Sequence, residues 1–309
     1  NADTGNIYIN SAVSKTGASD ATLTLVADNG IIMNSAIGVT SGNGKLNLDF
    51  TANGIPGGGT APTSVNANSL GIIVGGVGTM SLNGGNLTLT GTSYANQGAG
   101  VTFMPSALHP TGAANGCCAN LNITAGNITI NGTANTFSGT SGIGVYMTRY
   151  PNPVQLTATG NASVIGTVKG AGTGSGFYSS FSGANNNANS ITAGGTLSLR
   201  GNNRAATNNT SAAVYADGGL QLRSVGNLVV QAETNNAGAN AMNFTSNTND
   251  PMRANASFKS VDSLGNASGN VLIQSNQGGI NFSNSLAEAT SSKVIKGVNI
   301  TIDNTGAGM

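Results

Sequence analysis

Hydrophobic and polar residues alternate along short stretches of this 309-residue chain, and glycine-rich steps separate the stretches. One copy of the pattern runs over 81–85, continues as Asn-Leu-Thr-Leu-Thr over 86–90, and ends as Ala-Gly-Val-Thr-Phe over 99–103. A period of two places the apolar side chains on one face of a β-strand and the hydroxyl side chains on the other. Each copy therefore predicts a strand, a step, a second strand, a polar loop and a third strand.

This three-strand unit recurs from about residue 80 to the end of the chain. Its glycine steps stand at positions 85, 126, 160, 195, 226 and 269; the copy at 269 is looser, and another copy begins at 298. A single coil of this kind cannot bury its apolar face alone, but stacked coils bury a continuous core. The sequence therefore predicts an all-β parallel β-helix (β-solenoid) with three strands per coil, roughly eight to ten coils in one domain over 1–309. The alternative, unrelated hairpins of a sandwich, gives no reason to repeat a three-strand order.

The step residues carry a local prediction of their own. Glycine at a step is expected to adopt a positive φ and turn the chain sharply. The Asn beside it, as in Gly126-Asn127 and Gly160-Asn161, is expected to bond its own backbone or to stack on the Asn of the next coil. The alternation also makes two predictions about the whole fold. Helix content is expected to be close to nil. The apolar residues expected in the core are Leu87, Leu89, Ile128, Ile130, Leu197 and Leu199.

Composition narrows the class of protein. Only 7% of residues are charged, and eleven Lys and Arg against ten Asp and Glu give a net charge of +1. This balance predicts neither nucleic-acid binding nor electrostatic attachment to a membrane. There is no apolar run of the length needed for a transmembrane helix, so no membrane insertion is expected. The low charge and the abundance of Asn, Thr, Ser and Gly are typical of an extracellular bacterial surface protein.

Histidine and cysteine offer little chemistry. His109 is the single histidine, so no metal site is expected. The two cysteines, Cys117 and Cys118, are adjacent. They form a vicinal disulfide in an oxidising compartment, or they pack as two free thiols; the sequence leaves both open.

The stretch 21–37 reads ATLTLVADNGIIMNSAI, and 44–50 reads GKLNLDF. This sequence resembles the coil of two-partner-secretion exoproteins of the filamentous-haemagglutinin and high-molecular-weight adhesin group. The recurring motifs of that group are L-T-L-x-A, I-x-x-N-x-x-I and G-x-L-N-L. The resemblance implies a right-handed β-helix that an outer-membrane secretion partner exports to the bacterial cell surface. It also implies adhesion to a host or bacterial surface glycan or protein, with no cofactor. The chain starts and stops without a leader or a cap, which predicts a piece of a longer exoprotein.

Some β-helices cleave acidic polysaccharides, which requires two or three carboxylates, or a carboxylate and a base, in one groove. The ten acids of this chain do not fall at equal strand positions of neighbouring coils. Asp217 follows a third strand, and Arg200 and Arg204 follow the second strand of the same coil, but such a trio is typical of a solvated face. We expect no enzyme activity. A polysaccharide-active enzyme and a purely structural shaft remain the alternatives to an adhesin.

The third strands hold the candidate binding residues. Placing Val101, Val145, Phe177, Val214 and Met242 in the core puts Thr102, Tyr146, Tyr178, Tyr215 and Asn243 on the outer face. Three consecutive coils would then present a tyrosine ladder, which suits glycan or protein contact; the alternative is a ladder that only braces the coils. Loops are the second candidate surface, including Arg149 and Tyr150 in the proline-rich 149–153 and the stretch 245–258.

Overall fold

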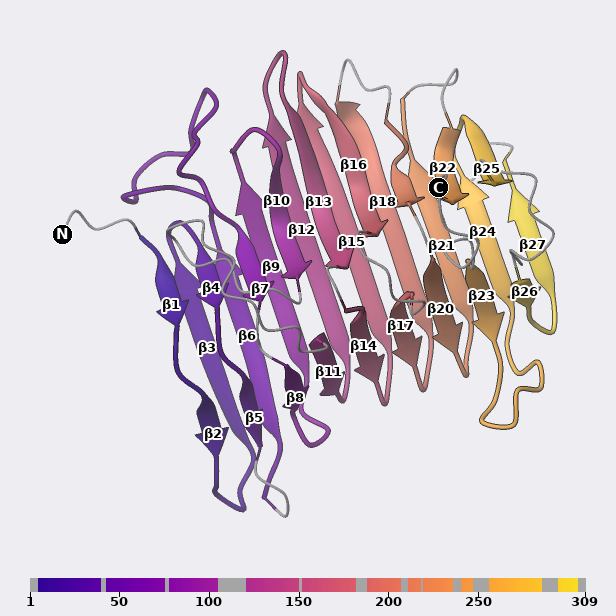
Figure 1. Cartoon of the computed structure of the whole chain (residues 1–309), viewed down its shortest axis with the longest axis horizontal. Coiled ribbons are helices and arrows are strands. Elements are labelled where there is room, and N and C mark those ends of the chain that lie inside the picture. Colours follow the sequence, from indigo (N-terminus) through magenta and orange to yellow (C-terminus); the bar gives the residue numbers. More distant parts are fainter. Residues whose placement is uncertain are drawn as a thin grey trace.

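The computed structural model describes residues 5–39, 43–75, 78–104, 121–149, 152–181, 188–206, 211–217, 219–235, 240–246, 256–284 and 294–304. These residues form a parallel β-helix of 27 strands, without a helix, and the ladders between successive coils are all parallel. Figure 1 shows the coils stacked side by side from the N-terminal to the C-terminal end. The predicted fold class is confirmed.

Each coil gives one strand to each of three faces. The first sheet has nine strands: β1 (Ile7–Ile9), β4 (Ile31–Met33), β7 (Ile72–Gly75), β10 (Gly98–Met104), β13 (Ser141–Arg149), β16 (Thr173–Phe181), β19 (Val214–Asp217), β22 (Asn240–Ser246) and β25 (Gly279–Asn284). The second sheet has seven: β8 (Thr79–Ser81), β11 (Leu121–Ala125), β14 (Val154–Ala158), β17 (Asn189–Ala193), β20 (Leu220–Ser224), β23 (Ser257–Ser260) and β26 (Val294–Lys296). A two-stranded sheet, β2 (Val13–Lys15) and β5 (Ile37–Val39), holds the corresponding place in the first two coils.

The third sheet again has nine strands: β3 (Ala21–Ala27), β6 (Leu46–Ala52), β9 (Leu87–Ser93), β12 (Ile128–Thr136), β15 (Ala162–Gly170), β18 (Leu197–Ala206), β21 (Leu228–Glu233), β24 (Val271–Ser275) and β27 (Ile300–Asp303). Nine coils agree with the eight to ten expected. The repeat begins earlier than its glycine steps indicated, because β1 to β7 form coils of the same helix.

The prediction of a loop over 245–258 was wrong at both ends, since Thr245 belongs to β22 and Phe258 to β23.

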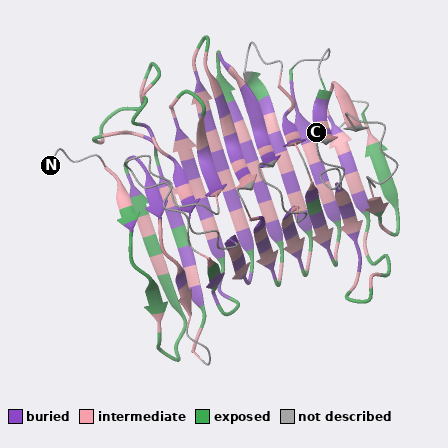
Figure 2. Cartoon of the chain, viewed as in Figure 1, coloured by how far each residue is buried: buried purple, intermediate pink, exposed green. Residues whose placement is uncertain are grey.

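The core lies where the alternation placed it. Ile128 pairs with Leu87 and Ile130 with Leu89 on neighbouring strands, and all four side chains are buried. Figure 2 shows buried and half-buried residues alternating along the long strands of the middle coils. Since coils stack about 4.8 Å apart, each apolar side chain sits on its counterpart in the next coil, and the core is continuous along the rod.

The predicted asparagine stacking is confirmed at the glycine steps. The backbone N–H of Asn127 donates to Oδ1 of Asn86 at 3.0 Å, and that of Asn161 donates to Oδ1 of Asn127 at 2.8 Å. The same bond joins these neighbours: Asn86 to Asn47, Thr196 to Asn161, and Asn270 to Asn227. Each side chain thus satisfies a backbone donor of the following coil, which fixes the register of the corner.

The glycines at the steps do not have the role that the sequence predicted. None of the six step glycines has a positive φ, although Gly84, which directly precedes the first step, has a φ of 81°. A Cβ at Gly85 would lie 2.0 Å from the carbonyl oxygen of Leu46, and one at Gly126 would lie 2.2 Å from that of Gly84. Glycine is needed there because the backbone of the preceding coil leaves no room for a side chain.

A second set of glycines joins the first and third sheets. It comprises Gly91, Gly132, Gly166 and Gly201 on the third sheet and Gly100, Gly144 and Gly176 on the first. A Cβ at Gly166 would lie 1.8 Å from the oxygen of Gly176, and one at Gly144 would lie 2.2 Å from the nitrogen of Thr167. The two sheets therefore meet backbone to backbone along this line, here called the glycine seam.

Candidate functional site

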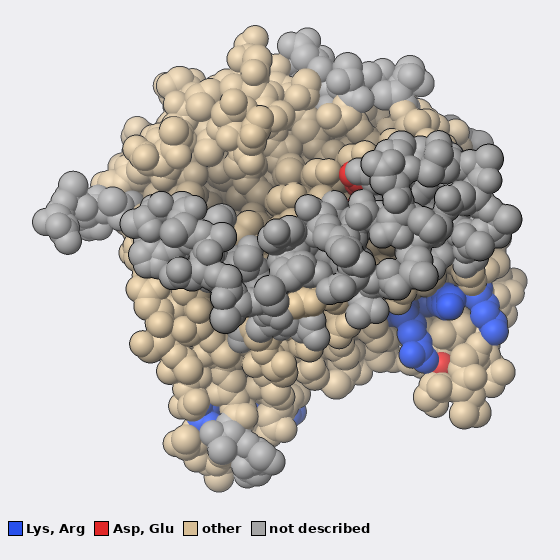
Figure 3. Space-filling view, in the orientation of Figure 1, with Lys and Arg blue, Asp and Glu red and all other residues tan. Residues whose placement is uncertain are grey.

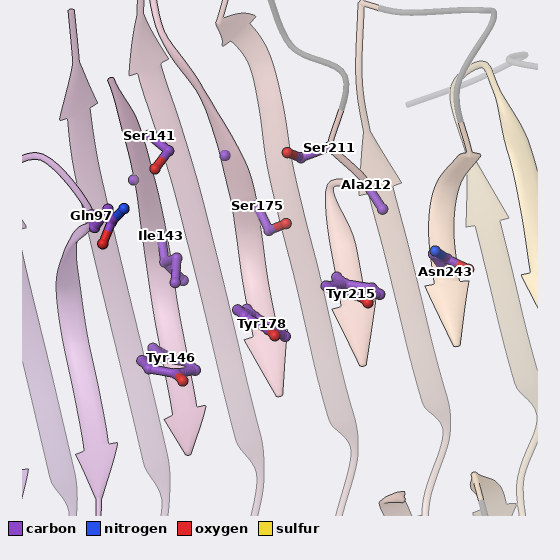
Figure 4. A pocket seen from close by; sticks show the side chains of 12 residues that line it. Gln97, Ser141, Ile143, Tyr146, Ser175, Tyr178, Ser211, Ala212, Tyr215 and Asn243 are labelled. Carbon is purple, nitrogen blue, oxygen red and sulfur yellow. The ribbon is translucent and has the colours of Figure 1, made fainter. Parts of the chain in front are cut away.

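The outer row of the first sheet carries three tyrosines on adjacent strands. Tyr146 of β13 pairs with Tyr178 of β16, which pairs with Tyr215 of β19. The ring centroids are 5.2 Å and 4.9 Å apart, with planes inclined by 24° and 23°, so the rings stack. Figure 4 shows the three rings in one row with the same orientation. The tyrosine ladder predicted from the sequence is confirmed in position.

The register extends beyond the tyrosines in both directions. Thr102 precedes Tyr146 in the outer row, as predicted, and only 8% of this residue is exposed. Asn243 follows Tyr215, also as predicted, and Asn281 follows Asn243. The Asn281 amide donates to Oδ1 of Asn243 at 2.8 Å. An amide row therefore continues the aromatic one.

A hydrogen bond to the next strand anchors the first ring of the ladder. The hydroxyl of Tyr146 hydrogen-bonds Oγ of Ser180 at 2.7 Å, and all three tyrosines are half-buried. Burial raises the pKa of the Tyr178 hydroxyl well above its ordinary value of 10.0, and the negative charge of Asp217 adds to the effect. The middle phenol of the ladder is therefore kept as a neutral hydrogen-bonding group.

This shift predicts a loss of stability at alkaline pH. The folded state holds the Tyr178 proton after the unfolded chain has released it, so the free energy of unfolding is expected to fall as the pH rises above about 10. Denaturant unfolding measured across this range tests the expectation. Tyr178→Phe removes the titrating group and should flatten the decline; an unchanged pH slope in that variant would contradict the assignment.

The tyrosines line an open groove with a volume of about 530 Å³. Figure 4 shows Ser141, Ser175 and Ser211 in a second row, displaced from the rings toward the N-terminal ends of β13, β16 and β19. Its lining comprises Gln97, Ser141, Gly142, Ile143, Tyr146, Gly174, Ser175, Tyr178, Ser211, Ala212, Tyr215 and Asn243. None of these residues carries a charge. The groove offers hydroxyl and amide groups beside aromatic rings, which suits a neutral hydroxyl-rich ligand.

Other predicted site residues lie elsewhere or outside the described residues. Arg149 is the last residue of β13, and its side chain lies outside the described part. Tyr150, His109, Cys117 and Cys118 also lie outside the described residues. The ligand role of Arg149 and Tyr150 and the state of the cysteines remain predictions.

Arg200 and Asp217, two charged residues singled out in the sequence, lie on different sheets. Arg200 of β18 forms an ion pair with Glu233 of β21, a contact that the sequence analysis missed. Glu233 also accepts a hydrogen bond from the Asn202 amide at 2.7 Å. Asp217 belongs to the first sheet instead, so it does not join Arg200 in one site. Among the described residues, no three His, Cys, Asp or Glu side chains lie close enough to hold a metal ion.

Comparison of the chain with models of known families, with curated proteins and with solved structures gave no match. Within the described ranges, no helix has the length and apolar character needed to span a membrane.

Proposed function

We propose that this chain is a segment of a secreted bacterial surface adhesin, which binds an uncharged surface glycan in the tyrosine-lined groove and performs no catalysis. The observation that carries the proposal is the groove itself, because three stacked tyrosines line it together with uncharged polar residues. Secretion and surface display are supported by the adhesin-like text over 21–50, which forms the coil strands β3 to β6.

The groove suits a glycan for physical reasons. The tyrosine row repeats at the coil spacing, so a chain of sugars lying along the rod meets the same groups more than once. The phenol hydroxyls and the serine row offer hydrogen bonds to sugar hydroxyls, while the ring edges cover the apolar faces of the sugars. Because the three tyrosines stand on strands of a stacked sheet, their rings lose little side-chain freedom on binding.

A purely structural shaft is the second candidate. Ring stacking between adjacent coils and the asparagine bonds at the corners both brace the rod, whether or not a ligand binds. The two functions differ in one measurable respect: a bracing ladder affects stability alone, whereas a binding ladder affects adhesion in a chain that is still folded.

The test is a pair of triple variants at Tyr146, Tyr178 and Tyr215. Replacement by Ser removes rings and hydroxyls and should weaken binding to uncharged glycans on an array by at least about tenfold. Replacement by Phe keeps the stacked rings and should give an intermediate loss, because only the hydrogen bonds disappear. The same variants are measured for adherence of bacteria that display the chain.

Tyr8→Ser is the matched control. Tyr8 stands on β1 in the same row of the first sheet, because the ladder leads from Tyr8 through Ile32, Ile73 and Thr102 to Tyr146. It is not among the residues that line the groove. It is 43% exposed, and its replacement should leave glycan binding unchanged. A folded Ser triple variant that binds and adheres like the parent chain would overturn the adhesin proposal for this groove and favour the shaft.

A further inference from the structure

A second groove lies on the second sheet and carries the opposite chemistry. Arg223 of β20 pairs with Lys259 of β23, which pairs with Lys296 of β26, so three cations stand in one column on successive coils. Figure 3 shows Lys and Arg gathered in one patch on this part of the surface. In the preceding coils the same row holds neutral side chains, namely Ser81, Thr124, Thr157 and Thr192.

Within the described ranges, no ion pair joins Arg223, Lys259 or Lys296 to an acid; the pair of Arg200 with Glu233 lies on the third sheet. Arg223 and Lys259 are half-buried, and Lys296 is exposed. Like charges on neighbouring strands repel one another. The column therefore costs stability, and a ligand that brings negative charge would relieve the repulsion.

One acid, Asp262, stands at the rim of the groove, and it is already engaged. Its carboxylate accepts hydrogen bonds from the backbone N–H groups of Asn266, at 2.8 Å, and Leu264, at 2.9 Å, and these bonds, that of Asn266 above all, hold its pKa below the ordinary range. Its backbone carbonyl accepts a bond of 2.6 Å from the Arg223 guanidinium. The turn thereby positions Arg223, which retains further N–H donors for a ligand.

The column borders an open groove of about 600 Å³. Its lining comprises Ser190, Thr192, Gln221, Arg223, Ser257, Lys259, Val261, Ser263, Leu264, Gly265, Val294 and Lys296. The polar members are hydroxyl and amide groups, and aromatic rings are missing from this set. A surface that binds single-stranded nucleic acid needs aromatic rings on which the bases stack, so this lining favours a ligand rich in hydroxyl groups.

We propose that this cationic groove binds an acidic polysaccharide that carries one carboxylate on each sugar, with the polymer lying along the axis of the rod. Successive cations are one coil apart, about 4.8 Å, which is close to the length of one sugar unit. Each carboxylate then meets one cation, and the fork of Arg223 can hold one of them with two bonds. The serine, threonine and glutamine side chains contact the sugar hydroxyls.

This groove adds a site of different specificity to the proposed adhesin and does not depend on it. The tyrosine-lined groove belongs to the first sheet and is uncharged, whereas the cationic groove belongs to the second sheet. Binding to the cationic groove should fall steeply with salt concentration, because charges at a surface are screened. Binding to the tyrosine-lined groove should change little with salt.

The experiment uses the whole chain and polygalacturonate as the probe, with neutral dextran as the reference polymer, in titration calorimetry at low and physiological salt. The double variant Lys259→Gln, Lys296→Gln should bind polygalacturonate at least about tenfold more weakly. The matched control, Lys45→Gln, Lys169→Gln, removes the same charge from exposed positions outside the groove and should bind like the parent chain.

Several outcomes would overturn the proposal. An equal loss of polygalacturonate affinity in the two double variants would show that net charge alone determines binding. Unchanged affinity in both would show that polygalacturonate does not bind in this groove. Tighter binding of dextran sulfate or of single-stranded DNA than of polygalacturonate would assign the groove to a different anion. The tyrosine triple Ser variant should retain polygalacturonate binding, so failure of one proposal is distinguishable from failure of the other.

Discussion

Replacing Gly166 with alanine is expected to lower the free energy of unfolding by about 3 kcal/mol or more, the upper range for overpacking a well-packed interior. The added Cβ would lie 1.8 Å from the carbonyl oxygen of Gly176 and 2.4 Å from its carbonyl carbon. Both are backbone atoms, so a side-chain rotation cannot relieve the clash. Relief requires the first and third sheets to separate at the seam, which would break the parallel ladders on either side.

Chemical denaturation of the variant measures this loss, and Gly17→Ala is the matched control. Gly17 is exposed, and a Cβ there would meet no atom within 4 Å. Neither glycine has a positive φ, so backbone conformation alone would make alanine neutral or slightly favourable at both positions. A Gly166→Ala chain as stable as Gly17→Ala would show that the sheets do not meet backbone to backbone.

Phe258→Ala is expected to cost about 3–5 kcal/mol, the range for removing a fully buried aromatic side chain. Phe258 of β23 is 0% exposed. Its ring packs edge-on against Phe244 at 5.0 Å and against Phe282 at 5.9 Å, and these two belong to the first sheet. The three rings thus join the first and second sheets in the C-terminal coils, and a cavity there would loosen both.

Phe258→Leu is the companion variant, because it keeps most of the apolar volume and should cost less than half as much. Thermal and denaturant unfolding compare the two variants. Since Phe258 adjoins Lys259 on β23, the alanine variant should also weaken polygalacturonate binding, whereas the leucine variant should not. A stability loss below about 1 kcal/mol for Phe258→Ala would mean that these rings are not a shared core.

Much of this architecture could be predicted from the sequence because two simple periods determine it. Alternation at period two fixes which side chains enter the core, and the recurrence of the coil fixes which residues become neighbours. Aligning Val145, Phe177 and Val214 as core positions was therefore enough to place the three tyrosines in one row. The asparagine stacking followed from the same alignment.

The cationic column was not predicted, because its strands do not follow the recognisable pattern. β23 and β26 are short, and residues 261–268 separate β23 from the glycine step at 269, so the register of these strands with β20 could not be aligned from the sequence. The Arg200–Glu233 pair was missed because the two residues are not at equal strand positions; Arg200 pairs with Gln231 in the ladder. Such contacts depend on how far a long side chain extends toward an offset residue of the next coil, and the period of the repeat does not predict this.

The physical reason for the glycines at the steps and along the glycine seam could not be predicted from the sequence either. Gly126 and Gly166 read as turn formers or weak strand residues, since both are roles that glycine commonly fills. The actual constraint is a carbonyl oxygen of a distant segment within about 2 Å of the missing Cβ. Distances between segments of this kind become visible only when the coils are assembled.

Stacking of whole coils also limits how binding in such a rod can change through evolution. One coil adds one side chain to every outer row, so tandem duplication or loss of a coil lengthens or shortens each row by one contact at a time. For a polymeric ligand with a repeating unit, each added contact raises the number of simultaneous attachments, and avidity would grow in steps. A change in the number of coils could therefore alter the avidity of such a rod for a polymer without any change in the kinds of side chain in each row.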